Sequence, residues 1–396
     1  MKLYAQHGYG KGSKIEKGIA EKIISGIILS PKAENPDKIK ELIEQTKTQN
    51  CSVDILFDPQ FYICAFAGEL SIGKLSNYPY YASGLTRIQL SVPSNVHRYV
   101  KEVIEFQQNI LALSKIISPT ILFDTFDGTH SQISVSLAYE SISMVDADKL
   151  FISLCINENA FRNLNAMDEF LNVLSLFEVK GFYITIERSN NDANQLAFDG
   201  EILSNIMYFC YVLSTINEFE VILGYTDLLL IPLITTGISA SACGWHNGQK
   251  IFSESNFQLK TGGRHAIKKY TSNKLLNSIT IIPEMTTIKD LNKLDMIMSA
   301  TKYDSFLQPM PDPANWTDEI SCLENWEALN SLVCEVNLLP TIKEKVKYIT
   351  SKIKNANTLY EQLDSFLFMQ SSRQKHLDNW LSAIEMFSEK IGISKK

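Results

Sequence analysis

Short apolar segments recur along the chain, and most of them have a polar residue at the carboxyl end. Their length and their richness in Ile, Leu, Phe and Val are typical of buried strands. We therefore predict eight strands: LYAQH (3–7), GIILSP (26–31), VDILFD (53–58), TILFD (120–124), LFISLCINE (150–158), GFYITIE (181–187), EVILGY (220–225) and ISASACG (238–244).

Stretches long enough for a helix, most of them with helical apolar spacing, separate nearly all of these strands. Strands that alternate with helices indicate a parallel sheet, and eight such units close into a (β/α)8 barrel, the TIM barrel. The strands are apolar throughout, as expected where both faces of a sheet are covered. The pattern predicts an α/β fold with a TIM barrel over residues 1–275.

The remainder of the chain, residues 276–396, has a helical pattern to its end. In TIKEKVKYITSKIK (341–354), Ile342, Val346, Ile349 and Ile353 recur at helical intervals, with lysines on the other face. We predict an α-helical C-terminal extension that packs on the barrel. Its helices are a candidate docking surface for a protein partner.

Polar residues at the strand ends predict where the site lies, because chemistry in such barrels is placed at the carboxyl ends of the strands. Carboxylates that share one mouth shift each other's pKa values, which suits general acid/base or nucleophilic work. A single such residue can equally cap a helix or join an ion pair. We select Asp58, Asp124 and Glu187 as candidate catalytic residues, and His7, Gln60, Asn157 and Tyr225 as candidate substrate-binding residues.

The segment after the last predicted strand is basic and aromatic. Between residues 250 and 274 there are six Lys or Arg residues and one acid, Glu254, with aromatic residues interleaved. Such a segment suits a substrate that carries phosphates and a base to stack, although a solvated basic loop is the simpler alternative. From this segment and the turn before it we select six more candidate substrate-binding residues: Gly244, Trp245, Lys250, Gly262, Gly263 and Arg264.

Composition limits the setting of the protein. The net charge is −7, so the chain as a whole is no obvious polyanion binder. Seven scattered cysteines without a CxxC pair suit reduced thiols and argue against a disulfide framework and a compact cysteine zinc site. No signal-peptide core and no apolar run of about 20 residues is present. We expect a cytoplasmic protein with no membrane contact, no bound metal and no cofactor.

Five segments together resemble the tRNA-guanine transglycosylase superfamily, barrel enzymes that exchange a guanine for a deazaguanine in nucleic acid. The resemblance covers roughly residues 50–270 and lies in the order of the elements. It is carried by VDILFDPQFYICAFAG (53–68), SPTILFDTFDGT (118–129), KGFYITIE (180–187), EVILGYTDLLLIPLITTGISASACGWHNGQKIF (220–252) and FQLKTGGR (257–264).

The resemblance implies roles for two aspartates, Asp58 as the acid/base carboxylate and Asp124 as the group that reads the base. The chain also departs from the family. Ala242 stands where the family has its nucleophilic aspartate, so the covalent ribosyl intermediate lacks its usual partner. The cysteine-rich zinc site that the family carries after the barrel is absent, since only Cys322 and Cys334 lie there.

Three functions fit these observations. The first is a divergent transglycosylase-like enzyme, a glycosyltransferase or related base-acting enzyme whose substrate is a nucleobase in nucleic acid or in a nucleotide, flipped out of a duplex where necessary. The second is a non-catalytic barrel that binds a nucleobase or nucleic acid for a partner enzyme. The third is a barrel enzyme that acts on a small phosphorylated metabolite. The fold by itself does not choose among them.

Overall fold

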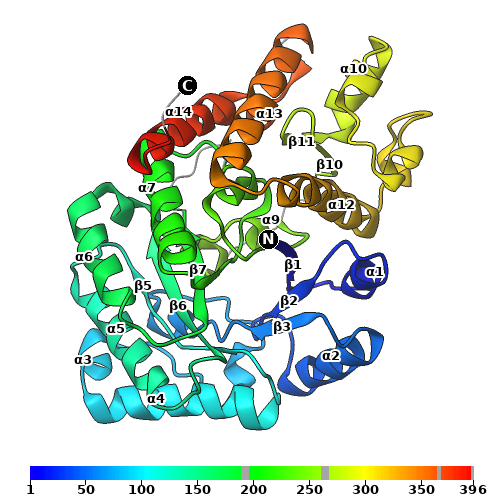
Figure 1. The fold of residues 1–396 in the computed structure, drawn as a ribbon. Coiled ribbons are helices and arrows are strands. Elements are labelled where there is room, and N and C mark those ends of the chain that lie inside the picture. Colours follow the sequence, from blue (N-terminus) through cyan, green and yellow to red (C-terminus); the bar gives the residue numbers. More distant parts are fainter. Residues whose placement is uncertain (189–195, 260–266, 364–366, 394–396) are drawn as a thin grey trace.

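The computed structural model describes residues 1–188, 196–259, 267–363 and 367–393. Parallel strands form a nearly closed barrel surrounded by helices (Figure 1), which confirms the predicted fold class. The strands of the barrel are β1 (Lys2–Gln6), β2 (Gly26–Leu29), β3 (Asp54–Phe57), β4 (Ile116–Ile117), β5 (Leu122–Phe123), β6 (Leu150–Asn157), β7 (Gly181–Glu187), β8 (Glu220–Leu223) and β9 (Ala240–Cys243).

Two short strands, β4 and β5, share the fourth position of the barrel, where one strand over 120–124 was predicted. Both pair in parallel with β6, Ile117 opposite Phe151 and Leu122 opposite Cys155. Pro119 lies between them, and proline has no N–H to donate to a strand ladder. The proline therefore divides the strand without moving its carboxyl end.

The barrel is open between β3 and β4, which end the strand order β3-β2-β1-β9-β8-β7-β6-β4. Side chains bridge this seam. Lys115 Nζ lies 2.6 Å from Asp54 Oδ1, an ion pair at the amino ends of the two strands. The side-chain amide of Gln107 occupies the place of a neighbouring strand, donating to Ile117 O at 2.7 Å and accepting from Ile117 N at 3.0 Å. The backbone N–H and C=O of Ile117 on the open edge of β4 thus have hydrogen-bond partners without a neighbouring strand.

In the described part of the chain, eight α-helices lie between barrel strands and a ninth follows the last of these strands. The helix that begins at Pro93 ends at Glu105, eleven residues before β4 begins at Ile116. In the long connection after β3, Tyr78 and Tyr80 are buried against Phe57 and Phe106. The helices are α1 (Lys14–Ala20), α2 (Pro36–Gln49), α3 (Arg87–Leu90), α4 (Pro93–Glu105), α5 (Thr129–Ile142), α6 (Leu164–Leu174), α7 (Gly200–Tyr211), α8 (Leu230–Leu233) and α9 (Asn247–Lys250).

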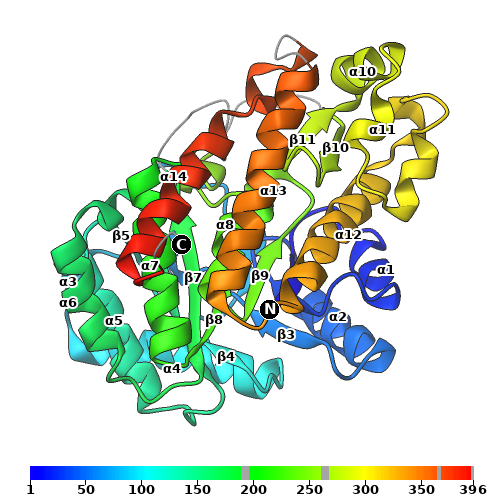
Figure 2. The ribbon, with the colours of Figure 1, turned by 45° about the horizontal axis from the view of Figure 1, so that its top comes forward.

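The C-terminal region begins with a hairpin and continues as helices that pack on the barrel. Helix α12 lies beside α1 and against β1 (Figure 2), and Trp326 Nε1 donates to Cys243 O at 3.1 Å. The predicted boundary at residue 275 falls in the turn of the hairpin and stays a prediction. The elements are β10 (Lys269–Ser272), β11 (Asn277–Thr280), α10 (Thr286–Asp290), α11 (Leu294–Ile297), α12 (Asp318–Asn337), α13 (Ile342–Leu363) and α14 (Lys375–Lys390).

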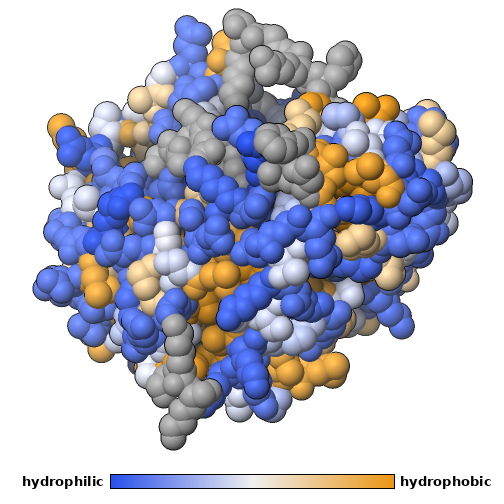
Figure 3. Space-filling view, turned by 90° about the horizontal axis from the view of Figure 1, so that it is seen from above, coloured by the Kyte–Doolittle hydropathy of each residue, from blue (hydrophilic) through white to orange (hydrophobic). Residues whose placement is uncertain are grey.

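The upper side of the molecule, in the direction of the C-terminal helices, is mainly hydrophilic, with apolar side chains gathered in a strip (Figure 3). Several large apolar side chains of the C-terminal region are exposed, among them Met310 and Leu338. A protein partner at these helices stays a prediction.

Nine side chains, at least one from each position of the barrel, fill its interior and form one buried cluster. This apolar cluster lies directly below the carboxyl ends of the strands, so the polar residues at the mouth pack on a solid barrel interior. The cluster consists of Tyr4, Ile28, Leu56, Ile117, Phe151, Tyr183, Ile222, Ala240 and Ala242.

Candidate functional site

Asp58, which follows β3, is held by three donors inside the barrel. Its Oδ1 accepts from Gln60 N at 2.9 Å, and its Oδ2 accepts from the hydroxyls of Tyr62 at 3.0 Å and Tyr183 at 3.2 Å. Burial raises the pKa of Asp58 to about 6, although these hydrogen bonds favour the ionised form. The carboxyl group therefore titrates near neutral pH.

An aromatic cluster, Tyr62, Phe66, Phe252 and Phe257, covers Asp58. The ring centroids of Tyr62 and Phe252 are 5.1 Å apart, and those of Phe66 and Phe257 are 5.8 Å apart. The cluster forms because the chain turns sharply at Gln60, whose φ is 51°, and then runs as a short helix over Phe61–Ala65. That turn returns Tyr62 over the strand end, and Asp58 is only 1% exposed.

Asp124 and Glu187 line a different space, which we call the acidic cavity. It has a volume of about 650 Å³, and we define it by Phe66, Asp124, His130, Asn157, Glu187 and Glu254. Asp124 is exposed there, whereas Asp58 does not line the cavity. The expectation that both aspartates face one common cavity is therefore corrected: the loop after β3 folds back over Asp58, and the loop after β5 leaves Asp124 open.

Glu187 is the most strongly held carboxylate of the acidic cavity. Strands β6 and β7 run in register, with Asn157 opposite Glu187, and the Asn157 amide donates to Glu187 Oε2. Glu187 Oε1 accepts from Glu254 N at 3.4 Å. Burial raises the pKa of Glu187, and the charges of Glu254 and Glu158 add to this effect. Glu187 thus has the electrostatic setting of a general acid or base.

A buried ion pair closes one side of the acidic cavity. Arg188 Nε lies 2.8 Å from Glu158 Oε2, with both side chains 6% exposed. The guanidinium also lies 3.4 Å from the ring centroid of Phe198. Because Arg188 is held by a carboxylate and a ring, it adds little net positive charge to the cavity.

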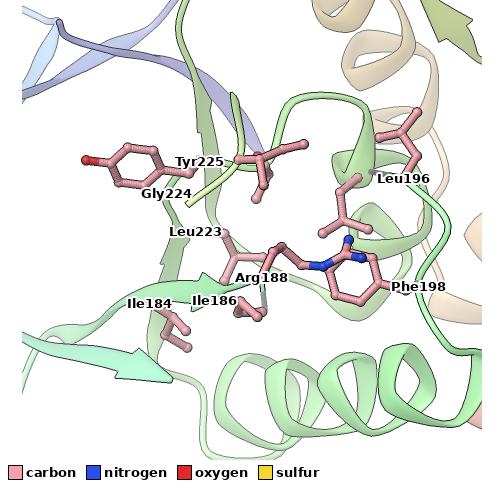
Figure 4. A pocket seen from close by; sticks show the side chains of 11 residues that line it. Ile184, Ile186, Arg188, Leu196, Phe198, Leu223, Gly224 and Tyr225 are labelled. Atoms are coloured by element: carbon pink, nitrogen blue, oxygen red, sulfur yellow. The ribbon is translucent and has the colours of Figure 1, made fainter. Parts of the chain in front are cut away.

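A small cavity next to this ion pair is apolar (Figure 4). Its volume is about 20 Å³, and Ile184, Leu223 and Leu196 are among its lining residues. Arg188 and Phe198 stack at one end, and the ring of Tyr225 extends away from them (Figure 4). An apolar space that is large enough for about one water molecule is no ligand site.

His7, Gln60 and Tyr225 line another pocket, which we call the histidine pocket and define by His7, Ser30, Lys32, Gln60, Tyr225 and Gln249. Its volume is about 190 Å³. Gln60 ties it together, since its Oε1 accepts from Ser30 Oγ and Lys32 N, both at 3.1 Å, and its Nε2 donates to Tyr225 Oη at 3.2 Å. Of the predicted site residues, these three lie together on one side of the aromatic cluster.

The predicted site residues that follow β9 do not gather in one pocket. Gly244 allows a close approach, because a Cβ there would lie 2.6 Å from Gln6 O. Trp245 Nε1 donates to Tyr9 O at 2.6 Å. Lys250 forms an ion pair with Asp227 at 3.3 Å and lines neither pocket, and its role as a substrate-binding residue stays a prediction. Gly262, Gly263 and Arg264 lie outside the described residues.

Sequence reasoning missed several residues of these sites, namely Tyr62, Tyr183, Lys32, Gln249 and Glu254. Alternation along β7 places Tyr183, Thr185 and Glu187 on one face, so this signal was available for Tyr183. Tyr62, Gln249 and Glu254 lie in short helical segments, and Lys32 lies in the turn after β2. The directions of these four side chains depend on how the connections between strands fold.

Ala242, at the position aligned with the family's nucleophile, is fully buried in the inner cluster beside Tyr4 and Ile222. A carboxylate there would lose its hydration within an apolar layer. The structure therefore offers no carboxylate from β9 to either pocket.

The chain matches no known protein-family profile and no curated protein. Within the described ranges, no three His, Cys, Asp or Glu side chains gather as metal ligands. None of the helices described is both long and apolar enough to span a membrane. The relationship to the tRNA-guanine transglycosylases stays a prediction.

Proposed function

We propose that the acidic cavity binds a nucleobase, presented by nucleic acid or by a nucleotide. The observation that carries the proposal is the combination of acceptors and an aromatic ring in one space of suitable size. Asp124, Glu187 and Glu254 supply carboxylate oxygens, and Phe66 supplies an aromatic side chain. A volume of about 650 Å³ lies in the usual range of ligand pockets.

The acceptors favour guanine among the common bases. Guanine presents two adjacent donors, N1–H and the N2 amino group, and a carboxylate accepts both at once. Adenine presents an acceptor beside its amino group, which a carboxylate repels. Asp124 is the group we assign to this edge, because it is exposed at the cavity and follows β5 directly.

A base-acting reaction is a second candidate function, and the raised pKa of Glu187 favours it. A carboxyl group with a raised pKa donates and accepts protons closer to neutral pH. In this scheme Glu187 exchanges a proton with the bound base, and Asn157 orients the carboxylate through its hydrogen bond.

Calorimetric titration with guanine, 7-deazaguanine, adenine and guanosine monophosphate tests the proposal. We expect guanine to bind about tenfold or more tightly than adenine, because a good bidentate contact discriminates by roughly 1–3 kcal/mol. Asp124→Asn is expected to weaken guanine binding by a similar factor.

Asp127→Asn is the matched control, since Asp127 is exposed three residues away and does not line the acidic cavity. Equal affinities for guanine and adenine, or equal losses in both variants, would contradict base binding. Proton exchange at guanine, measured in the wild type and in Glu187→Gln, tests the second candidate.

A further inference from the structure

The histidine pocket holds a buried donor without a partner. His7 is 1% exposed, and its Nδ1 accepts from Ser30 N at 3.4 Å. The ring nitrogen that accepts carries no hydrogen, so the hydrogen of the neutral ring is on Nε2. Among the described residues, no acceptor lies within hydrogen-bonding distance of this buried Nε2. A buried N–H without an acceptor costs free energy unless a ligand or water meets it.

Gln249 adds a second donor, and its orientation is fixed by the backbone. Its Oε1 accepts from Trp245 N at 3.1 Å and from His246 N at 3.3 Å, which identifies the other amide atom as nitrogen. That nitrogen lies against the backbone of Gly8, where a Cβ would be only 1.5 Å away. Only a glycine at position 8 leaves room for the Gln249 amide nitrogen at the histidine pocket.

Lys32 supplies positive charge at the same place. Its Nζ donates to Asn256 O at 2.9 Å and lies 4.4 Å from the ring centroid of Phe257. An ammonium group carries a positive charge and three hydrogens, and Lys32 lines the histidine pocket. Among the described residues that line the pocket, none is an Asp or Glu.

We propose that the histidine pocket binds an oxyanion, a phosphate or a carboxylate group of a small ligand. His7 Nε2–H and the Gln249 amide donate to its oxygens, and Lys32 balances its charge. The pocket is distinct from the acidic cavity, with which it shares no lining residue, so the proposal does not depend on what that cavity binds.

Titration calorimetry of the full chain with inorganic phosphate and, separately, with acetate tests this proposal. We expect one equivalent of anion to bind, and the tighter of the two probes identifies the class of oxyanion. His7→Phe keeps an aromatic ring but removes the donor, and is expected to weaken binding about tenfold or more. His97→Phe is the matched control, because His97 is exposed and pairs with Glu140 at 2.7 Å.

A second readout keeps the test decisive if His7→Phe does not fold. With ¹⁵N-labelled histidine in the wild-type chain, the Nε2–H resonance of His7 is expected to shift as the anion is added. No binding of either anion, an unchanged affinity in folded His7→Phe, or an unmoved His7 resonance would each overturn the proposal. Binding of an adventitious ion elsewhere would appear as an anion effect that His7→Phe leaves intact.

Discussion

The acidic cavity and the histidine pocket open at the same end of the barrel but have opposite chemistry. Three carboxylates line the first. The second contains a lysine and two fixed donors, with no carboxylate among its described lining residues. The aromatic cluster stands between them, with Phe66 lining the cavity and Phe257 lining the pocket. One barrel mouth can thus present an acceptor site and a donor site, provided that an apolar cluster separates their charges.

The burial of Asp58 under the aromatic cluster gives the largest effect that we expect. The pKa of Asp58, about 6, exceeds the ordinary value of 3.8, so the folded chain holds this proton more tightly than the unfolded chain. Unfolding then releases a proton between about pH 4 and pH 6, and the free energy of unfolding falls as the pH rises through this window. The loss due to this group is about 3 kcal/mol, on the scale of 1.36 kcal/mol for each pKa unit.

Asp58→Asn is expected to remove this component of the pH dependence. Urea denaturation of the wild type and the variant at several pH values measures it. Asp124→Asn serves as the control, because that side chain is exposed at the cavity. Parallel stability curves for the wild type and Asp58→Asn would show that Asp58 is not the buried, covered group described here.

A substitution at Gly244 is expected to disrupt anion binding in the histidine pocket without affecting the acidic cavity. A Cβ in Gly244→Ala would lie 2.5 Å from Gln249 Cβ and 2.6 Å from Gln6 O, so Gln249 has to move. We expect a loss of about 2 kcal/mol in the free energy of unfolding from overpacking, together with a loss of phosphate binding. Base binding in the acidic cavity is expected to persist.

Gly248→Ala is the companion measurement for stability alone, because Gly248 also lines the histidine pocket; the nearest atom to its Cβ would be 3.5 Å away, an ordinary contact. Thermal and urea denaturation report the stability, and the two titrations report the sites. An equal loss of base and phosphate binding in Gly244→Ala would mean that the two regions are not independent.

Tyr62→Phe is expected to have the smallest effect. It removes one hydroxyl donor to Asp58 Oδ2 and leaves that of Tyr183, with the ring of the cluster intact. Above about pH 7, where Asp58 is ionised, the cost is about 1 kcal/mol. At lower pH the cost is smaller, because the protonated group needs fewer donors.

The comparison variant is Tyr99→Phe, a buried tyrosine that packs on Phe61 at 5.7 Å between centroids. Denaturation at two pH values separates the two tyrosines, since only Tyr62→Phe is expected to depend on pH. A pH-independent cost would place the Tyr62 hydroxyl outside the titration of Asp58.

The sequence by itself determined the architecture, because strand and helix patterns are local. Apolar segments with polar ends predicted the barrel strands, and the carboxyl-end rule predicted that Asp124, Asn157 and Glu187 would lie at the mouth. The exception within the sheet is itself local, since Pro119 divides one strand into β4 and β5. The helical pattern of the C-terminal region was equally readable, as in α13.

Tertiary structure alone decided how the mouth is divided. A turn at Gln60 with a φ of 51° returns Tyr62 over Asp58, and no residue pattern specifies that direction. Lys250 turns to Asp227, and Gln249 turns to the pocket beside Gly8, although the two are adjacent in sequence. Which loop side chains meet depends on contacts between distant segments, because burial and hydrogen bonding in the assembled barrel set their positions.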